Sequence, residues 1–103
     1  MIIMFEKSPE VSVIIDFVKS LQPETVLEIG CNFGRELKHL EGLSNLYGID
    51  TSSEKIEKAK AYVKGIFRIA EASQIPYKDK KFDFVYSTGV LAHSPPEKIK
   101  FLV

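Results

Sequence analysis

Two acidic residues, each at or near the end of an apolar run, are the side chains of this 103-residue sequence best suited to hold a ligand. Glu28 stands in the run Val26-Leu27-Glu28-Ile29, and the stretch Gly30-Cys31-Asn32-Phe33-Gly34 follows it directly. Glycine lets the backbone bend sharply and lie against a ligand, and Asn32 tolerates the same left-handed conformation. A carboxylate at this place would repel a pyrophosphate and attract an ammonium group. The turn therefore indicates a nucleoside that carries a positively charged tail.

Asp50 is the second acid, and it closes the apolar run at residues 46–50. Its distance from Glu28 is about the twenty residues typical of the carboxylate that accepts ribose hydroxyls in nucleotide-binding folds. An ionised carboxylate can accept both sugar hydroxyls in charge-assisted hydrogen bonds. Because Thr51-Ser52-Ser53-Glu54 resembles a capping box, the alternative is that Asp50 is only a strand-end acid or a cap.

The pattern Glu28-x-Gly30-x-x-x-Gly34 resembles the first motif of the class I S-adenosylmethionine-dependent methyltransferases, of the type 11/25-like group. Asn32 stands where that family usually has glycine, and the alternative is a plain strand-turn-helix without a ligand. The resemblance implies that the cofactor is S-adenosylmethionine, with S-adenosylhomocysteine as its product, and that no metal is needed. The cofactor-binding residues that it implies in this region are Glu28, Gly30, Cys31, Asn32, Gly34, Asp50 and Thr51.

Two later stretches are similar to further motifs of the same family. Residues 70–77 resemble its adenine-binding loop, in which Glu71 would accept a hydrogen bond from the exocyclic amine and the Ala72 N–H would reach the ring. The family more often has aspartate there, and the alternative is an ordinary polar loop. Residues 81–96 resemble the fourth motif, with Ser87 as a cofactor contact and His93 as the candidate catalytic base. The alternative for His93 is a residue that only caps or lines the loop before the last helix.

The spacing of apolar residues predicts alternating strands and helices around these motifs. Strands are expected at residues 26–29, 46–50, 66–69 and 82–87. Four helices are expected: at residues 8–21, after Gly34, from the capping box at residues 51–54 to Gly65, and from Ser94 onward. The predicted fold is α/β, Rossmann-like, with three α/β/α layers and a mostly parallel sheet of about four strands in the order 3-2-1-4. We expect one domain over residues 1–103. Residues 1–5 are either a short strand or a flap.

The expected last helix is still apolar on one face where the sequence ends, and a class I methyltransferase sheet has seven strands. We therefore expect a truncated domain that holds the cofactor-binding half. The fourth strand would then have an open edge, with Phe82, Phe84 and Tyr86 on one face. A homodimer or a completing second chain is expected at that edge.

The composition limits the partners and the compartment. Fourteen basic residues balance fourteen acidic ones, so the net charge of zero gives no electrostatic footprint for nucleic acid or a membrane surface. Cys31 is the single cysteine, which excludes an intrachain disulfide and fits the reducing cytoplasm. No apolar stretch is long enough to span a bilayer.

The sequence thus predicts an S-adenosylmethionine-dependent methyltransferase with a small-molecule acceptor. The alternative is a non-catalytic module that binds the cofactor or dimerises. A nicotinamide oxidoreductase is disfavoured, because Glu28 would repel the pyrophosphate and Arg35 replaces the third glycine of the dinucleotide motif.

Overall fold

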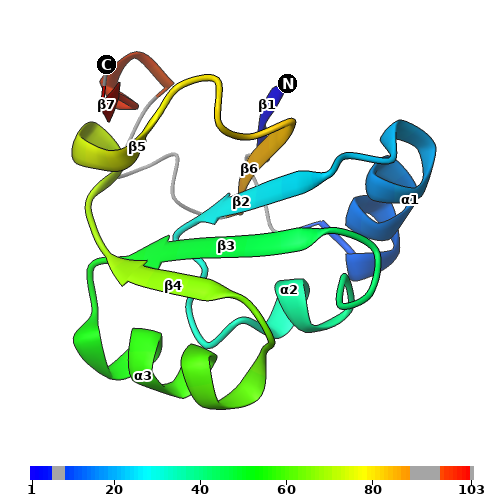
Figure 1. The fold of residues 1–103 in the computed structure, drawn as a ribbon, viewed down its shortest axis with the longest axis horizontal. Coiled ribbons are helices and arrows are strands. Elements are labelled where there is room, and N and C mark those ends of the chain that lie inside the picture. Colours follow the sequence, from blue (N-terminus) through cyan, green and yellow to red (C-terminus); the bar gives the residue numbers. More distant parts are fainter. Residues whose placement is uncertain (6–8, 89–95, 103) are drawn as a thin grey trace.

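A computed structural model describes residues 1–5, 9–88 and 96–102, and its centre is a sheet of five strands in the order β1-β6-β2-β3-β4 (Figure 1). All neighbouring pairs are parallel. The strands are β1 (Ile2–Phe5), β2 (Thr25–Ile29), β3 (Asn45–Asp50), β4 (Ile66–Ile69) and β6 (Phe84–Thr88). The α/β class, the parallel sheet and the order of the four expected strands are confirmed. The expected number of strands in this sheet was one too low, and the strands β5 (Ile75–Lys78) and β7 (Phe101–Leu102) of a second, small sheet were not expected.

The additional strand of the five-stranded sheet is β1, for which the sequence left a strand and a flap open. β1 pairs with β6 from Ile2↔Val85 to Phe5↔Thr88, so the edge of β6 that we expected to be open is paired within the chain. The aromatic face expected there is wrong as well. Phe84 and Tyr86 are buried in one core cluster, whereas Phe82 precedes the strand and packs in the other. The predicted association through β6 therefore loses its structural basis.

Three helices cover one face of the sheet, α1 (Val11–Leu21), α2 (Arg35–Lys38) and α3 (Ser53–Tyr62) (Figure 1). The buried apolar residues of α1 and α3 recur at helical spacing and therefore point to the same side, where Leu37 of α2 is also buried. Side chains of the helices and of the turns that follow them form a core with this face of the sheet, in which Ile14, Val18, Leu37, Leu40, Ile56, Ala59 and Val63 pack with Val26, Leu46, Phe67, Phe84 and Tyr86.

The opposite face is covered by short elements. These are the 3₁₀ turn η1 (Ala72–Gln74), the strand β5 (Ile75–Lys78) and the strand β7 (Phe101–Leu102), and β5 and β7 pair in a small parallel sheet. The core on this side contains Leu27, Ile29, Ile49, Ala72, Ile75, Phe82 and Val85. In the described part of the chain, strands and turns thus form the outer layer where a three-layer arrangement would place helices.

The helix expected from Ser94 onward is not formed in the part of it that the structure describes. Residues Pro96–Lys98 make a 3₁₀ turn, η2, and β7 follows. The Lys100 N–H donates to the Ala72 carbonyl and the Ile75 N–H donates to the Lys100 carbonyl, both at 2.8 Å. The half-buried side chains of Ile99 and Phe101 pack against the second core. The local capping pattern favoured a helix, but pairing with β5 buries these apolar side chains.

The first helix begins at Val11, after an N-cap at Glu10, whereas we expected it to begin at Ser8, which lies outside the described residues. It ends at Leu21, where Gln22 adopts a left-handed conformation with φ of 48° just before Pro23. Among the described residues, no helix has the length and apolarity needed to cross a bilayer.

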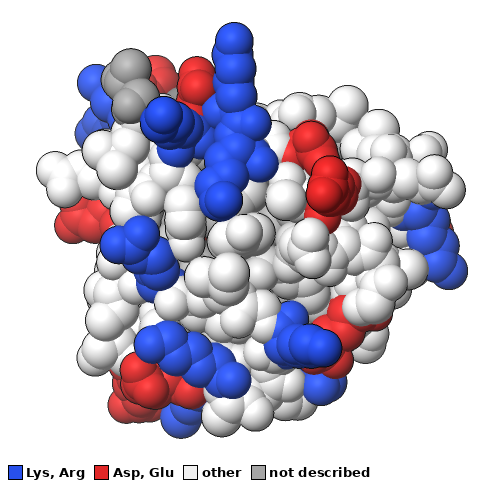
Figure 2. Space-filling model, in the orientation of Figure 1, with Lys and Arg blue, Asp and Glu red and all other residues white. Residues whose placement is uncertain are grey.

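Basic and acidic side chains are interspersed on the face seen in Figure 2. Blue and red side chains lie next to one another over α3, at the bottom of the view, where Lys58 pairs with Glu54 and Lys60 pairs with Glu57. These exposed pairs each contribute little to stability.

Candidate functional site

The glycine turn after β2 has the backbone that the sequence requires. Gly30, Asn32 and Gly34 all have positive φ, at 72°, 57° and 85°. The N–H groups of Gly30 and Cys31 both donate to the Ile49 carbonyl, at 2.8 and 2.9 Å. The turn is therefore fastened to the carboxyl end of β3. A Cβ at Gly34 would lie 2.7 Å from Val63 Cγ2, so this glycine is needed for close packing as well as for its φ.

The Asp50 carboxylate connects two turns at the carboxyl end of β3. Its Oδ2 accepts a hydrogen bond from the Asn32 N–H at 2.9 Å, and its Oδ1 accepts one from the Ser52 N–H at 3.0 Å. Each carboxylate oxygen can accept a further hydrogen bond. Asp50 is only partly buried, and Thr51 beside it is exposed. The carboxylate is thus held in a fixed orientation and remains able to accept hydroxyl groups.

Glu28 lies beneath the turn, on the face of the sheet that carries the helices. Its side chain is completely buried, opposite Tyr86 in the register of β2 and β6. The Thr88 Oγ1 lies 3.5 Å from Glu28 Oε2 and 3.5 Å from Glu36 Oε1. Burial raises the pKa of Glu28 well above its ordinary value, and the neighbouring Glu36 carboxylate raises it further. Glu28 and Asp50 therefore have different environments, one buried beneath the turn and the other partly exposed beside it.

Cys31 lies inside the turn and is fully buried. Burial raises the pKa of its thiol, and the charges of Glu28 and Asp50 add to the effect. A thiol of this kind is a poor nucleophile, because the thiolate is the reactive form. Cys31 is therefore a packing residue of the turn.

The expected adenine loop adjoins the same end of the sheet. The Ala70 N–H donates to the Asp50 carbonyl at 3.0 Å, which brings the loop next to the second acid. Glu71 is exposed, with its Oε2 3.4 Å from Ser73 Oγ, whereas Ala72 is buried. Tyr77 contacts Tyr47 and Phe82 edge-on, with ring centroids 5.6 and 5.2 Å apart, so this ring packs beneath the loop.

Ser87, at the carboxyl end of β6, is buried, and its Oγ has no hydrogen-bond partner among the described residues. His93 lies outside the described residues. The structure thus brings the glycine turn, Asp50 and the Glu71 loop to one end of the sheet. Within the described ranges, no group of three or more His, Cys, Asp and Glu side chains is arranged to hold a metal ion.

Sequence reasoning missed Glu36, which joins Glu28 beneath the turn. Its exposed fraction is only 8%, and Arg35 Nε contacts its Oε2 at 2.9 Å. The available signal was the position of this acid directly before Leu37 and four residues before Leu40, on the apolar side of the helix that the sequence predicts after Gly34. A charged residue on such a side needs a polar partner in the core.

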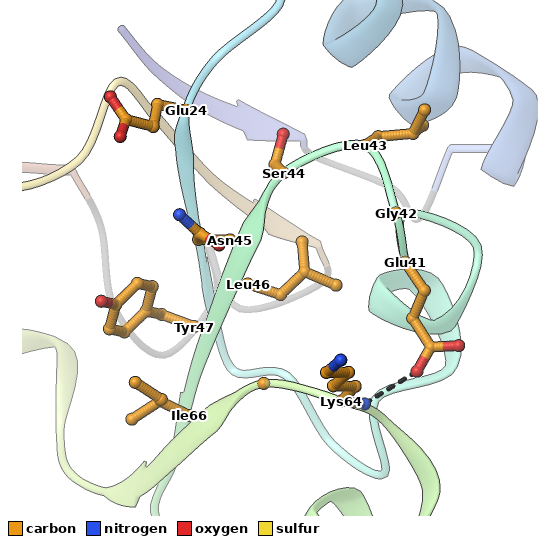
Figure 3. A pocket seen from close by; sticks show the side chains of 11 residues that line it. Glu24, Glu41, Gly42, Leu43, Ser44, Asn45, Leu46, Tyr47, Lys64 and Ile66 are labelled. Carbon is orange, nitrogen blue, oxygen red and sulfur yellow. Dashed lines mark hydrogen bonds between the residues drawn. The ribbon is translucent and has the colours of Figure 1, made fainter.

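A hollow of about 750 Å³ lies at the opposite end of the strands (Figure 3). None of the predicted site residues lines it. Figure 3 shows Glu41, whose carboxylate accepts a hydrogen bond from the Lys64 N–H at 2.7 Å, on one side of the hollow. The other side is formed by residues of β3 and β4, with Tyr47 and Ile66.

The family model described as a methyltransferase domain matches residues 27–102. Among curated proteins, the chain is similar to the O-methyltransferase cnsE of Penicillium expansum, with 30% identity over 70% of this chain and 29% of that protein. It is similar also to the uncharacterized protein MJ1252 of Methanocaldococcus jannaschii, with 39% identity over 66% of this chain and 26% of that protein. The chain thus spans less than a third of the length of these relatives.

A solved structure with the same fold is that of the plantazolicin methyltransferase BpumL in complex with SAH. Its TM-score is 0.61 at 24% identity, over 75% of this chain and 33% of that one. At this identity the likeness is one of fold.

Proposed function

Since this chain belongs to the methyltransferase domain family, we propose that it binds S-adenosylmethionine at the carboxyl ends of β2, β3 and β6. The Asp50 carboxylate, fastened to the turns on both sides, is the observation that carries this proposal. A carboxylate with one free acceptor position on each oxygen suits the two vicinal hydroxyls of a ribose. The complex of BpumL with SAH supports the same class of ligand.

The residues present fit the cofactor. The turn that contains Cys31, with positive φ at Gly30, Asn32 and Gly34, gives the ligand a close approach to the backbone. Asp50 and the adjacent Thr51 form hydrogen bonds with the ribose hydroxyls, and Glu28 attracts the positively charged ammonium of the amino-acid tail. Glu71 and the Ala72 N–H bind the adenine edge, and Ser87 contacts the cofactor from β6. Glu28 Oε1 and Ser87 Oγ, which have no hydrogen-bond partner in the part of the chain that the structure describes, are polar groups that a ligand could satisfy.

The proposed activity is methyl transfer to a small-molecule acceptor. The cofactor supplies a methyl group that its sulfonium already activates. The protein then needs mainly to align the acceptor and exclude water. His93 remains our candidate for the base that removes a proton from a hydroxyl acceptor. The name of the O-methyltransferase cnsE supports an acceptor of this kind.

Calorimetric titration with S-adenosylhomocysteine tests the proposal through Asp50→Ala. Two lost hydrogen bonds to a charged group correspond to at least about a tenfold loss of affinity. Asp83→Ala is the matched control, because Asp83 Oδ2 also accepts two backbone N–H groups, from Glu24 and Thr25, but at the opposite end of the sheet. We expect Asp83→Ala to lower stability and leave affinity unchanged. A folded wild-type chain that does not bind the ligand, or equal affinities in both variants, would contradict the proposal.

A non-catalytic module, which binds S-adenosylmethionine without transferring its methyl group, is the second candidate. Incubation with methyl-labelled S-adenosylmethionine and a panel of hydroxyl acceptors distinguishes the two. Binding without transfer to any acceptor favours the module.

A further inference from the structure

Four polar side chains meet beneath the glycine turn, between the sheet and α2. Glu28 comes from β2, Glu36 from α2, and Tyr86 and Thr88 from β6. Glu28 and Tyr86 are completely buried, and Glu36 is 8% exposed. The Thr88 hydroxyl lies 3.5 Å from a carboxylate oxygen of each glutamate, so the two carboxylates share one small polar site.

Two atoms of this site have no hydrogen-bond partner among the described residues, Glu28 Oε1 and the Tyr86 hydroxyl. Most buried polar atoms in folded proteins are paired, because an unpaired one loses its hydration without compensation. Both atoms belong to side chains that are completely buried. Glu36 and Tyr86 both face the Glu28 carboxyl group, but neither Glu28 Oε1 nor the Tyr86 hydroxyl has hydrogen-bond geometry to another described residue, so this part of the chain leaves acceptor and donor capacity at the site.

The charges around the site are unevenly distributed. Arg35 contacts Glu36 Oε2 at 2.9 Å, but its side chain is 73% exposed and lies on the solvent side. Glu28 faces Glu36 from α2 and Tyr86 and Thr88 from β6, and none of these carries a positive charge. Burial and the Glu36 carboxylate both raise the pKa of Glu28. The empty site consequently favours one proton shared by the two carboxyl groups.

We propose that Glu36 joins Glu28 as a receptor for the primary ammonium group of the ligand's tail, and that this ammonium displaces the proton which the empty pair holds. The inference rests on the cofactor-binding function proposed above. A primary ammonium has three N–H donors, and the site offers Glu28 Oε1, Glu36 Oε1 and Thr88 Oγ1 as acceptors. As the cation enters, the carboxylic proton leaves to solvent and the Tyr86 hydroxyl donates to the ionised Glu28. Glu36 is then a specificity-determining residue for a ligand with a charged amine.

The test compares two ligands that differ in the tail. S-adenosylhomocysteine carries the ammonium group, and 5′-methylthioadenosine has the same nucleoside without it. Titration calorimetry in buffers of different ionisation enthalpy counts the protons exchanged, and it needs no variant. We expect S-adenosylhomocysteine to release up to one proton near neutral pH and 5′-methylthioadenosine to release none.

Glu36→Gln keeps the shape of the side chain and removes its charge. We expect it to weaken S-adenosylhomocysteine binding about tenfold or more, and to leave 5′-methylthioadenosine binding unchanged. Glu41→Gln is the control, since Glu41 is also a glutamate paired with a basic side chain, Lys38, but lies away from the turn. It should change neither affinity.

Three results would refute the proposed ammonium site of Glu28 and Glu36. They are binding of S-adenosylhomocysteine without proton release, an unchanged ratio of the two affinities in Glu36→Gln, and an equal loss of both affinities in that variant. In each of these results the ligands still bind the wild-type chain, so the proposed cofactor site would stand. Failure of both ligands to bind the folded wild-type chain would instead overturn the proposed function, and the receptor with it.

Discussion

Replacing Gly48 with alanine tests whether packing against β3 holds the glycine turn in place. Gly48 lies between Glu28 of β2 and Phe67 of β4 in the sheet register. An added Cβ would come within 2.8 Å of Cys31 Sγ and within 2.8 Å of two ring carbons of Phe67. Cys31 is fully buried and Phe67 is 4% exposed, so neither can move into solvent. The sheet, the sulfur or the ring must therefore shift.

Overpacking of a buried site costs about 1–3 kcal/mol of the free energy of unfolding. For a domain of this size, each kcal/mol lowers the melting temperature by roughly 4–8 °C. Thermal and urea unfolding of Gly48→Ala measure this loss. Because Cys31 belongs to the turn, we also expect weaker binding of S-adenosylhomocysteine.

A double-mutant cycle with Cys31→Ala separates the contact from other effects. Removing the sulfur opens space for the new Cβ, so Gly48→Ala should cost less in the Cys31→Ala background. The expected coupling is at least about 0.5 kcal/mol, as for residues in direct contact. Gly48→Ala with wild-type stability, or two costs that simply add, would refute the reasoning.

Two further predictions concern the buried groups. Glu28 keeps its proton to a higher pH in the folded state than in the unfolded chain, where its pKa is about 4.5. The free energy of unfolding should therefore fall as the pH rises above 4.5. The expected slope is up to about 1.4 kcal/mol per pH unit. Urea unfolding across this pH range should show that Glu28→Gln removes the slope, and an identical slope in the variant would argue against it. The Cys31 thiol, buried and with a raised pKa, should react with iodoacetamide only through unfolding. Mass spectrometry should therefore find labelling that accelerates with urea, and native labelling at the denatured rate would contradict this.

The elements that were predictable from the sequence are those whose signals are local. The run from Val26 to Gly34 combines a buried strand, residues suited to positive φ and a helix start, and the structure has all three. Asp50 likewise lies at the end of a strand, at the expected distance from the turn. Its bonds to both turns could not be foreseen, because they depend on how β2 and β3 pair.

The errors occurred where distant packing decides the structure. Residues 1–5 are too few to distinguish a strand from a flap, and β6 selects the strand by pairing with it. Ser94-Pro95-Pro96-Glu97 has the local chemistry of a helix start, yet Ile99 and Phe101 cover the second face of the sheet. The role of Glu36 could not be predicted for the same reason. A single acid on the apolar side of a helix has no evident partner in the sequence, and only the packing of the helix on the sheet brings it to Glu28.

Asp50 and Asp83 show why a hydrogen-bond pattern alone does not identify a site. Both carboxylates accept two backbone N–H groups, Asp50 at the carboxyl ends of the strands and Asp83 at the amino ends. The same device therefore fastens the loops at each end of the sheet. Only Asp50 adjoins a turn with three positive φ angles and a buried carboxyl group, that of Glu28, with one oxygen that has no hydrogen-bond partner among the described residues. The combination of a fixed acceptor, an accessible backbone and buried polarity favours a ligand at the carboxyl end, because the described residues leave that polarity without a partner.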